Sequence, residues 1–402
     1  MIPMQISSEI IHNVEFLTGS YEILKAAGET PALPVFSDGA VSFLADLSRE
    51  ILKDRRSGEY ADVISYAYWI RRASLESEKK LYTDGQNRIG RGTAFHIAPS
   101  NVPVNFAVSM TSSLLAGNIT VIRVSDKKFV QADIIIDAVN QLLAGCYRNM
   151  QPYLCIVRYA HSASITQELS SICDIRIVWG GNRTVETIRK AALPPRAVEM
   201  AFADRYSIAV IDADVYLQSD AEETAKSFYT DTYYTDQNAC SSPRLVVWLG
   251  NAVEQAKERF WTKLNDLAVR DYDMQPVQSV DKYTSFCMLA MRKKDIRLVS
   301  AENYVMRVSV DKLDPDLMEY KNGGGYFFEY RAKELEEIVP LLGKQCQTVA
   351  VLGISNEEIK KLVFDYGVRG VDRIVPLGKT MELSFIWDGY QMIDSMSRYV
   401  YL

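Results

Sequence analysis

The chain has 402 residues, 48% of them hydrophobic, which is enough for two or three domains that each bury an apolar core. Its formal net charge of −6 and pI near 5.4 argue against a general attraction for nucleic acid. No run of about 18 apolar residues occurs, and the N-terminus lacks a basic region followed by an apolar segment. We therefore expect a cytoplasmic protein without a membrane or nucleic-acid partner, whose ligand is a small molecule or another protein.

The six cysteines are scattered along the chain without a C-x-x-C pair, and the three histidines lie far from one another in the sequence. Disulfide frameworks and zinc sites usually show closely spaced residues of these kinds. We therefore expect neither a disulfide framework nor a bound metal.

The N-terminal hundred residues are predicted to be largely helical. In the segment AVSFLADLSREILKD, Leu44, Leu47 and Ile51 recur on one helical face. From about Gly92 to Arg244, strand-like and helix-like segments alternate: TAFHIA, VNFAVSMTSSLLAG, ITVIRV, ICDIRIVWGG and NRTVETIRKAAL. This alternation is typical of a parallel sheet covered by helices on both faces.

The alternation restarts after Arg205 with the strand YSIAVIDAD, the helix AEETAKSFYTDTYYTD and the strand RLVVWLG. We interpret the restart as a second α/β domain. The linker is predicted to be LPPRAVEMAFADR, because Pro194 and Pro195 end the preceding helix. The predicted domains are residues 1–205, completed by about 376–402, and residues 206–375.

The first candidate loop is HIAPSNVPVNF, in which a strand ends at Ala98 and two proline rings stiffen a turn that displays Asn101. Loops at strand ends are where open α/β sheets bind ligands. A rigidly held amide is a good donor to a developing oxyanion, because it need not reorganise when the charge appears. The alternative is that Asn101 only caps the helix that follows.

Two further loops carry candidate ligand contacts. Arg123 ends the strand ITVIRV and is followed by Ser125; its planar guanidinium suits a ribose or a 2′-phosphate, with a surface ion pair as the alternative. In VWGGNRTVETIR, Gly180 and Gly181 allow a close approach, and the unpaired amides of a helix start near Thr184 attract anions. These glycines do not form the dinucleotide motif G-x-G-x-x-G, so an ordinary tight turn is the alternative.

Cys240 lies in the polar stretch YYTDQNACSSPR, between a predicted helix end and a predicted strand start. Cysteines that serve packing lie in apolar runs, as Cys155 does in YLCIVRYA, whereas polar surroundings favour the nucleophilic thiolate. Cys240 is therefore a candidate nucleophile, with an incidental polar cysteine as the alternative. A Cys-His hydrolase would require the fold to bring His96 to it.

Taken in order, these loops resemble the aldehyde dehydrogenase superfamily. Within it, five stretches from about residue 88 to the C-terminus are similar to the bacterial LuxC-type acyl-CoA (fatty-acid) reductases: GRGTAFHIAPSNVPVNFAVSMTSSLLAGNITVIRVSDK, IVWGGNRTVETIR, FADRYSIAVI, DQNACSSPR and WDGY. The resemblance implies an aldehyde-dehydrogenase-like α/β fold, with two doubly wound parallel domains and an oligomerisation extension. It implies Cys240 and Asn101 as catalytic residues. The cofactor contacts that it implies are Ala98, Pro99, Ser100, Arg123, Ser125, Gly180, Gly181, Asn182 and Thr184.

One departure from the wider superfamily bears on the reaction. Ordinary aldehyde dehydrogenases have a Glu-Leu-Gly-Gly stretch, whose glutamate activates the water that hydrolyses the acyl-enzyme. The matching region here reads VEMAFADRYS, with Ala201 or its neighbours where that glutamate is expected. Without this base, a thioester on Cys240 should survive long enough to be reduced. Glu199, two residues away from Ala201, is the alternative base.

The resemblance implies NADPH-dependent reduction of an acyl-CoA or acyl-protein thioester to an aldehyde, through an acyl-enzyme on Cys240. Arg123 replaces the usual ribose-binding lysine and motivates NADPH rather than NADH. Two alternatives stay open: an NAD(P)-dependent aldehyde dehydrogenase, and a Cys-dependent acyltransferase or thioesterase without cofactor. The family also implies an acyl-protein synthetase partner and homo-oligomers, for which the apolar end SRYVYL offers a pairing strand.

Overall fold

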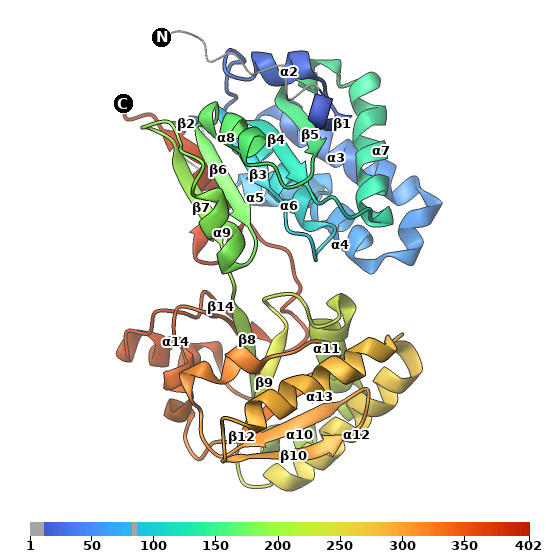
Figure 1. Ribbon diagram of the computed structural model, residues 1–402, viewed down its shortest axis with the longest axis vertical. Coiled ribbons are helices and arrows are strands. Elements are labelled where there is room, and N and C mark those ends of the chain that lie inside the picture. The colour runs from blue at the N-terminus through green and yellow to red at the C-terminus, as the bar shows by residue number, and fades with distance from the viewer. Residues whose placement is uncertain (1–11, 83–86) are drawn as a thin grey trace. The chain divides into compact units, whose positions relative to one another are not determined.

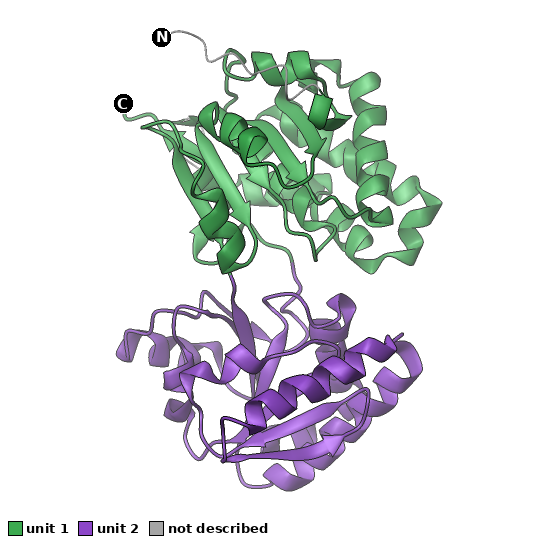
Figure 2. Cartoon of the chain, viewed as in Figure 1, with its two compact units in different colours: residues 1–203, 383–402 green, residues 204–382 purple. Residues whose placement is uncertain are grey.

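The computed structural model describes residues 12–82 and 87–402. The chain divides into two compact units, Met1–Ala203 together with Leu383–Leu402, and Asp204–Glu382 (Figure 2). We name them unit 1 and unit 2. Each has its own main sheet and its own apolar core. The roles predicted for the two domains stay predictions.

Unit 1 is built on a six-stranded sheet. Its strands are β1 (Glu15–Thr18), β3 (Thr93–Ile97), β4 (Ile119–Val124), β5 (Leu154–Arg158), β6 (Ile175–Trp179) and β7 (Val198–Phe202). Their order is β1-β5-β4-β3-β6-β7, with β1 antiparallel to β5 and the others parallel (Figure 1). The chain thus builds outward from β3 in both directions, which is the doubly wound arrangement predicted from the sequence.

Helices cover both faces of this sheet. They are α2 (Tyr21–Ala26), α3 (Asp38–Lys53), α4 (Ala61–Trp69), α5 (Arg72–Lys79), α6 (Asn105–Leu115), α7 (Val130–Ala144), α8 (Ala163–Ser171) and α9 (Asn182–Ile188). Neighbouring residues of one strand, such as Val121 and Ile122, belong to different apolar clusters, because successive side chains of a strand point to opposite faces. Leu44, Leu47 and Ile51 are buried on α3, as predicted.

The returning segment 383–402 completes unit 1. Its elements are β15 (Ile386–Trp387), β16 (Tyr390–Gln391), α15 (Met392–Met396) and β17 (Ser397–Tyr399), and the last strand pairs with β2 (Arg88–Gly90). Asp388 and Gly389 connect β15 to β16 with φ of 49° and 75°, the positive values that a tight hairpin turn favours. The WDGY motif is therefore a hairpin turn. Part of the SRYVYL end pairs within its own chain, and assembly into homo-oligomers stays a prediction.

Unit 2 is built on a seven-stranded sheet. Its strands are β8 (Tyr206–Asp212), β9 (Pro243–Leu249), β10 (Ile296–Ala301), β11 (Met306–Val310), β12 (Tyr326–Arg331), β13 (Cys346–Leu352) and β14 (Arg373–Pro376). They follow the order β10-β11-β12-β9-β8-β13-β14, with β10 antiparallel to β11 and the remaining pairs parallel. The predicted second α/β domain is confirmed.

The helices of unit 2 are α10 (Ala213–Gln218), α11 (Ala221–Thr232), α12 (Val253–Asp271), α13 (Pro276–Ala290) and α14 (Asn356–Asp365). Along β9, Val246 and Val247 belong to two different apolar clusters, one on each face of the sheet. No helix in the described ranges combines the length and apolar character needed to cross a membrane.

The predicted linker LPPRAVEMAFADR is wrong over part of its length, because it contains β7 at the edge of the unit 1 sheet. A strand that contains a half-buried charged side chain resembles a linker when only its composition is considered. The sequence analysis also assigned no elements between ITVIRV and ICDIRIVWGG, where α7, β5 and α8 lie.

Candidate active site

Three of the predicted loops meet at one edge of the unit 1 sheet. Ile97 at the end of β3 pairs with Arg123 of β4 on one side and is in register with Val178 of β6 on the other. Because these strands are adjacent and parallel, the loops that follow them begin side by side. We name this carboxyl edge of β3, β4 and β6 the unit 1 edge. It is where a doubly wound sheet binds its ligand.

Asn101 is exposed in the loop after β3, beside the exposed Ser100 and the half-buried Pro99. The loop is anchored at Ala98, which is buried and whose N–H donates to the Arg123 carbonyl at 2.9 Å. The cap position of α6 is Val104, and no side chain caps this helix. The alternative role of Asn101 as the cap is therefore not observed, and its amide is open to a ligand.

Arg123 is buried rather than part of a surface ion pair, with 8% of its surface exposed. Its Nη2 donates to the Tyr159 carbonyl at 3.2 Å, and its guanidinium lies 5.0 Å from the centre of the Tyr159 ring. The buried Nε has no hydrogen-bond partner within the described part of the chain. A buried N–H group without a hydrogen bond is energetically unfavourable, and an acceptor atom of a bound ligand would remove this cost. The Ser125 hydroxyl accepts from the Lys127 N–H at 3.2 Å, so it also stabilises the turn.

The glycine turn after β6 has a packing cause. A Cβ on Gly180 would lie 3.0 Å from Thr184 Cγ2, closer than most real contacts. α9 begins at Asn182, the first residue of the predicted helical segment NRTVETIRKAAL, with Gly181 at its cap position and no side-chain cap. Asn182 and Thr184 are exposed. The turn therefore presents backbone rather than bulky side chains at the unit 1 edge.

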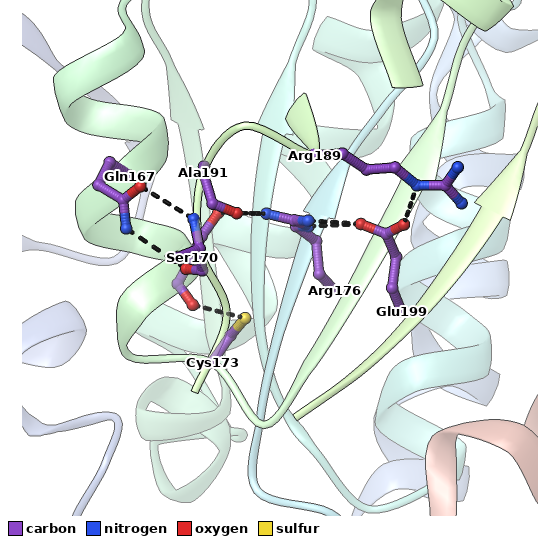
Figure 3. A network of polar contacts seen from close by, with 8 residues as sticks. Gln167, Ser170, Cys173, Arg176, Arg189, Ala191 and Glu199 are labelled. Carbon is purple, nitrogen blue, oxygen red and sulfur yellow. Dashed lines mark hydrogen bonds and ion pairs between the residues drawn. The ribbon is translucent and has the colours of Figure 1, made fainter. Parts of the chain in front are cut away.

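Glu199, the alternative base, is held by two arginines (Figure 3). Its Oε2 accepts from Arg176 Nη2 at 2.5 Å, and its Oε1 accepts from Arg189 Nε at 2.7 Å. Arg176 is fixed in turn by the Ala191 carbonyl at 2.7 Å. Glu199 and Arg176 are paired at the second positions of β7 and β6, so the carboxylate lies toward the amino ends of these strands, away from the unit 1 edge. The aldehyde-oxidising alternative therefore lacks a free base at Glu199.

His96 is a core residue of unit 1, with no exposed surface. Its Nδ1 lies 2.7 Å from Ser109 Oγ, which accepts from Trp179 Nε1 at 3.0 Å. The indole N–H donates to Ser109 Oγ, and the same hydroxyl is the hydrogen-bond partner of His96 Nδ1. Burial lowers the pKa of His96 to about 3. This enclosed, neutral ring is not placed to activate a thiol, which weakens the Cys-His hydrolase alternative.

The loop before β9 holds Cys240 in a fixed conformation. Asp236 and Gln237 both have positive backbone φ angles, 52° and 58°, which residues other than glycine rarely adopt. The fully buried Gln237 donates through Nε2 to the Pro243 and Tyr326 carbonyls at 3.0 and 3.1 Å. Its Oε1 accepts two backbone N–H groups near the start of β12. Gln237 thus fastens the loop to the sheet and offsets its backbone strain.

The stretch NGGG, residues 322–325, packs against the same loop. The Gly324 N–H donates to the Asp236 carbonyl at 2.9 Å, and a Cβ on Gly323 would lie 2.6 Å from that oxygen. Lys282, which is 1% exposed, donates to the Gly324 carbonyl at 2.6 Å. Burial lowers the pKa of Lys282 to about 8. Gly323 is therefore explained by its close approach to the backbone of the Cys240 loop, and Gly325 by its close approach to the Tyr304 carbonyl.

The Cys240 thiol is partly exposed and has polar partners from neighbouring strands. Gln347 Nε2 donates to Cys240 Sγ at 3.1 Å, and the Ser207 hydroxyl donates to the Cys240 carbonyl at 2.7 Å. Burial lowers the pKa of Arg244 to about 10, and interaction with the charge on Cys240 opposes that lowering. A donor and a nearby cation both favour the thiolate form.

The sequence analysis missed Gln347, Ser207 and Arg244 as partners of Cys240. In both ladders that flank β8, the register shifts beside Ser207, and the skipped residues are Arg244 of β9 and Gln347 of β13. Such bulges re-aim side chains, often next to active sites. The signal that was present is a polar residue at the amino end of each apolar strand, in YSIAVI, PRLVVWL and CQTVAVL.

Comparisons with known proteins agree with this architecture. A long-chain acyl-protein thioester reductase of Photorhabdus luminescens is 23% identical over 321 residues, which cover 77% of this chain and 63% of that protein. Its namesake in Vibrio harveyi is 24% identical over 294 residues, 72% of this chain and 59% of that protein. The chain thus spans about three-fifths of the length of these relatives.

Among solved structures, lactaldehyde dehydrogenase from Escherichia coli matches with a TM-score of 0.68 at 14% identity, over 94% of this chain and 88% of that one. This match confirms the predicted aldehyde-dehydrogenase-like fold. A family model described as acyl-CoA reductase (LuxC) matches residues 55–399, which confirms the resemblance seen in the sequence. The chain therefore belongs to the acyl-CoA reductase (LuxC) family.

Proposed function

We propose that this chain reduces an acyl thioester to an aldehyde, through an acyl-enzyme on Cys240 and with NADPH as the cofactor. The observation that carries the proposal is the partly exposed Cys240 thiol, held in a rigid loop beside the buried Arg244. The curated relatives are named for the reduction of an acyl-protein thioester and the family for the reduction of acyl-CoA. Both names describe a thioester substrate, and we extend that substrate class to this chain.

In the first step, Cys240 Sγ attacks the thioester carbonyl carbon and forms a new carbon–sulfur bond. The oxyanion is held by the Asn101 amide, whose loop is stiffened by Pro99 and Pro103. The original carbon–sulfur bond then breaks, and its electron pair leaves with the thiol of coenzyme A or of the acyl-protein. The product is an acyl thioester on Cys240.

The unit 1 edge fits a nicotinamide cofactor. Arg123 has a buried donor without a partner among the described residues, and its fixed positive charge suits a 2′-phosphate. The residues that would hold the cofactor are Ala98, Pro99, Ser100, Arg123, Ser125, Gly180, Gly181, Asn182 and Thr184. When bound, NADPH supplies the hydride that reduces the thioester. The resulting thiohemiacetal on Cys240 releases the aldehyde and restores the thiolate.

The surroundings of Glu199 favour a reductase over a dehydrogenase. Hydrolysis of the acyl-enzyme needs a carboxylate free to accept a proton from water. Both oxygens of Glu199 are bound by arginines, and its place in the sheet is away from the unit 1 edge. We therefore propose that the thioester on Cys240 persists until it is reduced.

The proposal assigns cofactor binding and the oxyanion donor Asn101 to unit 1, and the nucleophile Cys240 to unit 2. It extends to a cytoplasmic setting, where reduced thiols, acyl-CoA and NADPH coexist. It also includes acyl transfer from an acyl-protein synthetase and assembly into homo-oligomers, both of which we take from the family resemblance.

The test is acylation followed by reduction. Wild type, Cys240→Ala and Cys287→Ala are incubated with acyl-CoAs of increasing chain length while thiol release and intact mass are recorded; NADPH is then added. Cys287 is the matched control, because it is an exposed cysteine of the same unit. We expect an acyl adduct on wild type and Cys287→Ala but not on Cys240→Ala, and its discharge as aldehyde with oxidation of NADPH. An adduct that persists in Cys240→Ala, or that NADPH does not discharge, contradicts the proposal.

A further inference from the structure

The contact between Gln347 and the Cys240 sulfur has no role in the chemistry described above. Gln347 Nε2 lies 3.1 Å from Sγ, a short distance for an N–H group that donates to sulfur. A thiolate accepts such a bond far better than a thioester sulfur, because charged acceptors form the stronger hydrogen bonds. The contact is therefore strongest in the states of the reaction in which Cys240 is ionised.

The fold fixes the position of this amide. Gln347 is the residue skipped by the register shift between β13 and β8, and it has no exposed surface. The next residue, Thr348, donates its N–H to Ser207 Oγ at 3.2 Å, and the Ser207 hydroxyl donates to the Cys240 carbonyl at 2.7 Å. One serine thus ties the bulge and the Cys240 loop together. An amide held in this way meets a developing charge without reorganisation.

Arg244 acts on the same sulfur in a different way. It interacts electrostatically with Cys240, while its Nη1 donates to the Asn322 carbonyl. A charge at a distance favours the thiolate but does not orient it, whereas a directed N–H bond does both. The two groups come from bulges on either side of β8.

We propose that Gln347 is a catalytic residue that donates its side-chain N–H to the Cys240 sulfur whenever that sulfur is a thiolate. The inference rests on the proposed function for its second part, the release of aldehyde. When the thiohemiacetal oxyanion collapses, an oxygen lone pair forms the C=O bond of the aldehyde and the electron pair of the C–S bond returns to sulfur. The Gln347 N–H donates a hydrogen bond to the negative charge that develops on Cys240 Sγ, so it stabilises this thiolate as the leaving group.

The test uses the pH dependence of Cys240 alkylation, which requires neither acyl substrate nor cofactor. Wild type, Gln347→Met and Gln347→Asn are treated with iodoacetamide between pH 5 and 10, and the modified Cys240 peptide is quantified by mass spectrometry. Methionine matches glutamine in size without donating, and asparagine keeps the amide but is too short to reach the sulfur. We expect the midpoint of the profile to rise by about one pH unit in both variants.

The matched control is Gln345→Met, the same substitution at an exposed position two residues earlier, which should leave the midpoint at the wild-type value. Thermal unfolding of each variant shows whether it is folded. A midpoint that is unchanged or lower in folded Gln347→Met overturns the inference, even if Cys240 is acylated and the proposed function holds. Conversely, a raised midpoint without any acyl adduct on wild type keeps Gln347 as a thiolate donor and contradicts the proposed function instead.

Discussion

The two units build their candidate sites at different ends of their parallel strands. In unit 1, the candidate loops follow the carboxyl ends of β3, β4 and β6. In unit 2, Cys240 precedes β9, and its partners stand at the amino ends of β8, β9 and β13. The rule that open α/β sheets bind ligands at their carboxyl edge therefore locates the first site and not the second.

The two sites also differ in how their polar groups are held. Of the proposed cofactor contacts in unit 1, Ser100, Asn182 and Thr184 are exposed, and Arg123 and Ser125 are the buried exceptions. In unit 2, Gln237 and Gln347 have no exposed surface. A large cofactor must enter and leave its site in each turnover, so an open edge of loops and backbone suits it. A reacting atom gains from a fixed position, because misplacement by about 1 Å can reduce the rate by about 100-fold. The difference matches the division of roles that we propose.

The buried titratable groups predict a further difference between the two units, in how their free energies of unfolding depend on pH. His96 in unit 1 has the largest expected effect on this free energy. Burial lowers the pKa of its imidazole from 6.5 to about 3, so the unfolded chain takes up a proton below pH 6.5 that folded unit 1 does not. The free energy of unfolding of unit 1 should therefore decrease as the pH falls from 6.5 toward 3, by on the order of 5 kcal/mol in full. Urea midpoints read from hydrogen exchange of β3 peptides measure this slope, and His96→Gln should flatten it. The same slope in His96→Gln would show that another group is responsible.

Asp231 in unit 2 should give the opposite slope. It has no exposed surface, and its oxygens accept from the Gly378 and Thr380 N–H groups at 2.6 and 3.0 Å. Burial outweighs these bonds and the charge of the nearby Arg373, and raises the pKa of Asp231 from 3.8 to about 6.

Folded unit 2 therefore binds the Asp231 proton more tightly than the unfolded chain does. This contribution to the free energy of unfolding is complete below pH 3.8 and is lost as the pH rises through 6, a change on the order of 3 kcal/mol. Hydrogen exchange of α11 peptides in urea measures it, with Asp231→Asn expected to show no such slope. If unit 2 instead loses stability in acid as unit 1 does, the contrast between the two buried groups is wrong.

The sequence predicts the fold that places the unit 1 loops together, but not the contacts around Cys240 in unit 2, and the reason is physical. Alternating apolar strands and helices reveal a doubly wound sheet, and the loops after its strands follow in chain order, so Asn101, Arg123 and Gly180 could be selected as candidates from local sequence alone. Cys240 was selected as a candidate because a thiol among polar residues is unusual. Gln347 was not found, since its partner lies 107 residues away along the chain and only a register shift brings the two side chains together.

β7 in unit 1 is a second element that local sequence could not predict, because it depends on a contact with another segment. VEMAF alternates as an edge strand does, but two prolines before it and a glutamate within it favour a linker when each residue is considered alone. The glutamate is compatible with a strand because Arg176 and Arg189 neutralise it, and Arg176 belongs to the neighbouring strand. Ion pairs and bulges join segments that are far apart in the sequence. Patterns within one segment do not reveal them, so the sequence analysis did not predict them.

The smallest expected effect is that of Arg123 on NADPH binding, which tests the cofactor role of unit 1 separately from the acylation of Cys240. Arg123→Met should weaken NADPH binding by about tenfold or more, the loss of one charge-assisted contact, while NADH binding stays within a few-fold of wild type. Acylation of Cys240 by acyl-CoA should not change, because Arg123 takes no part in the acylation step that we propose. Fluorescence titration of both nucleotides and intact mass after acyl-CoA treatment measure these effects, with the exposed Arg148→Met as the matched control.

Equal weakening of NADPH and NADH would mean that Arg123 supports the unit 1 edge through Tyr159 rather than contacting a 2′-phosphate. Loss of acylation would mean that Arg123 also supports the acylation step, contrary to the role that we propose for it.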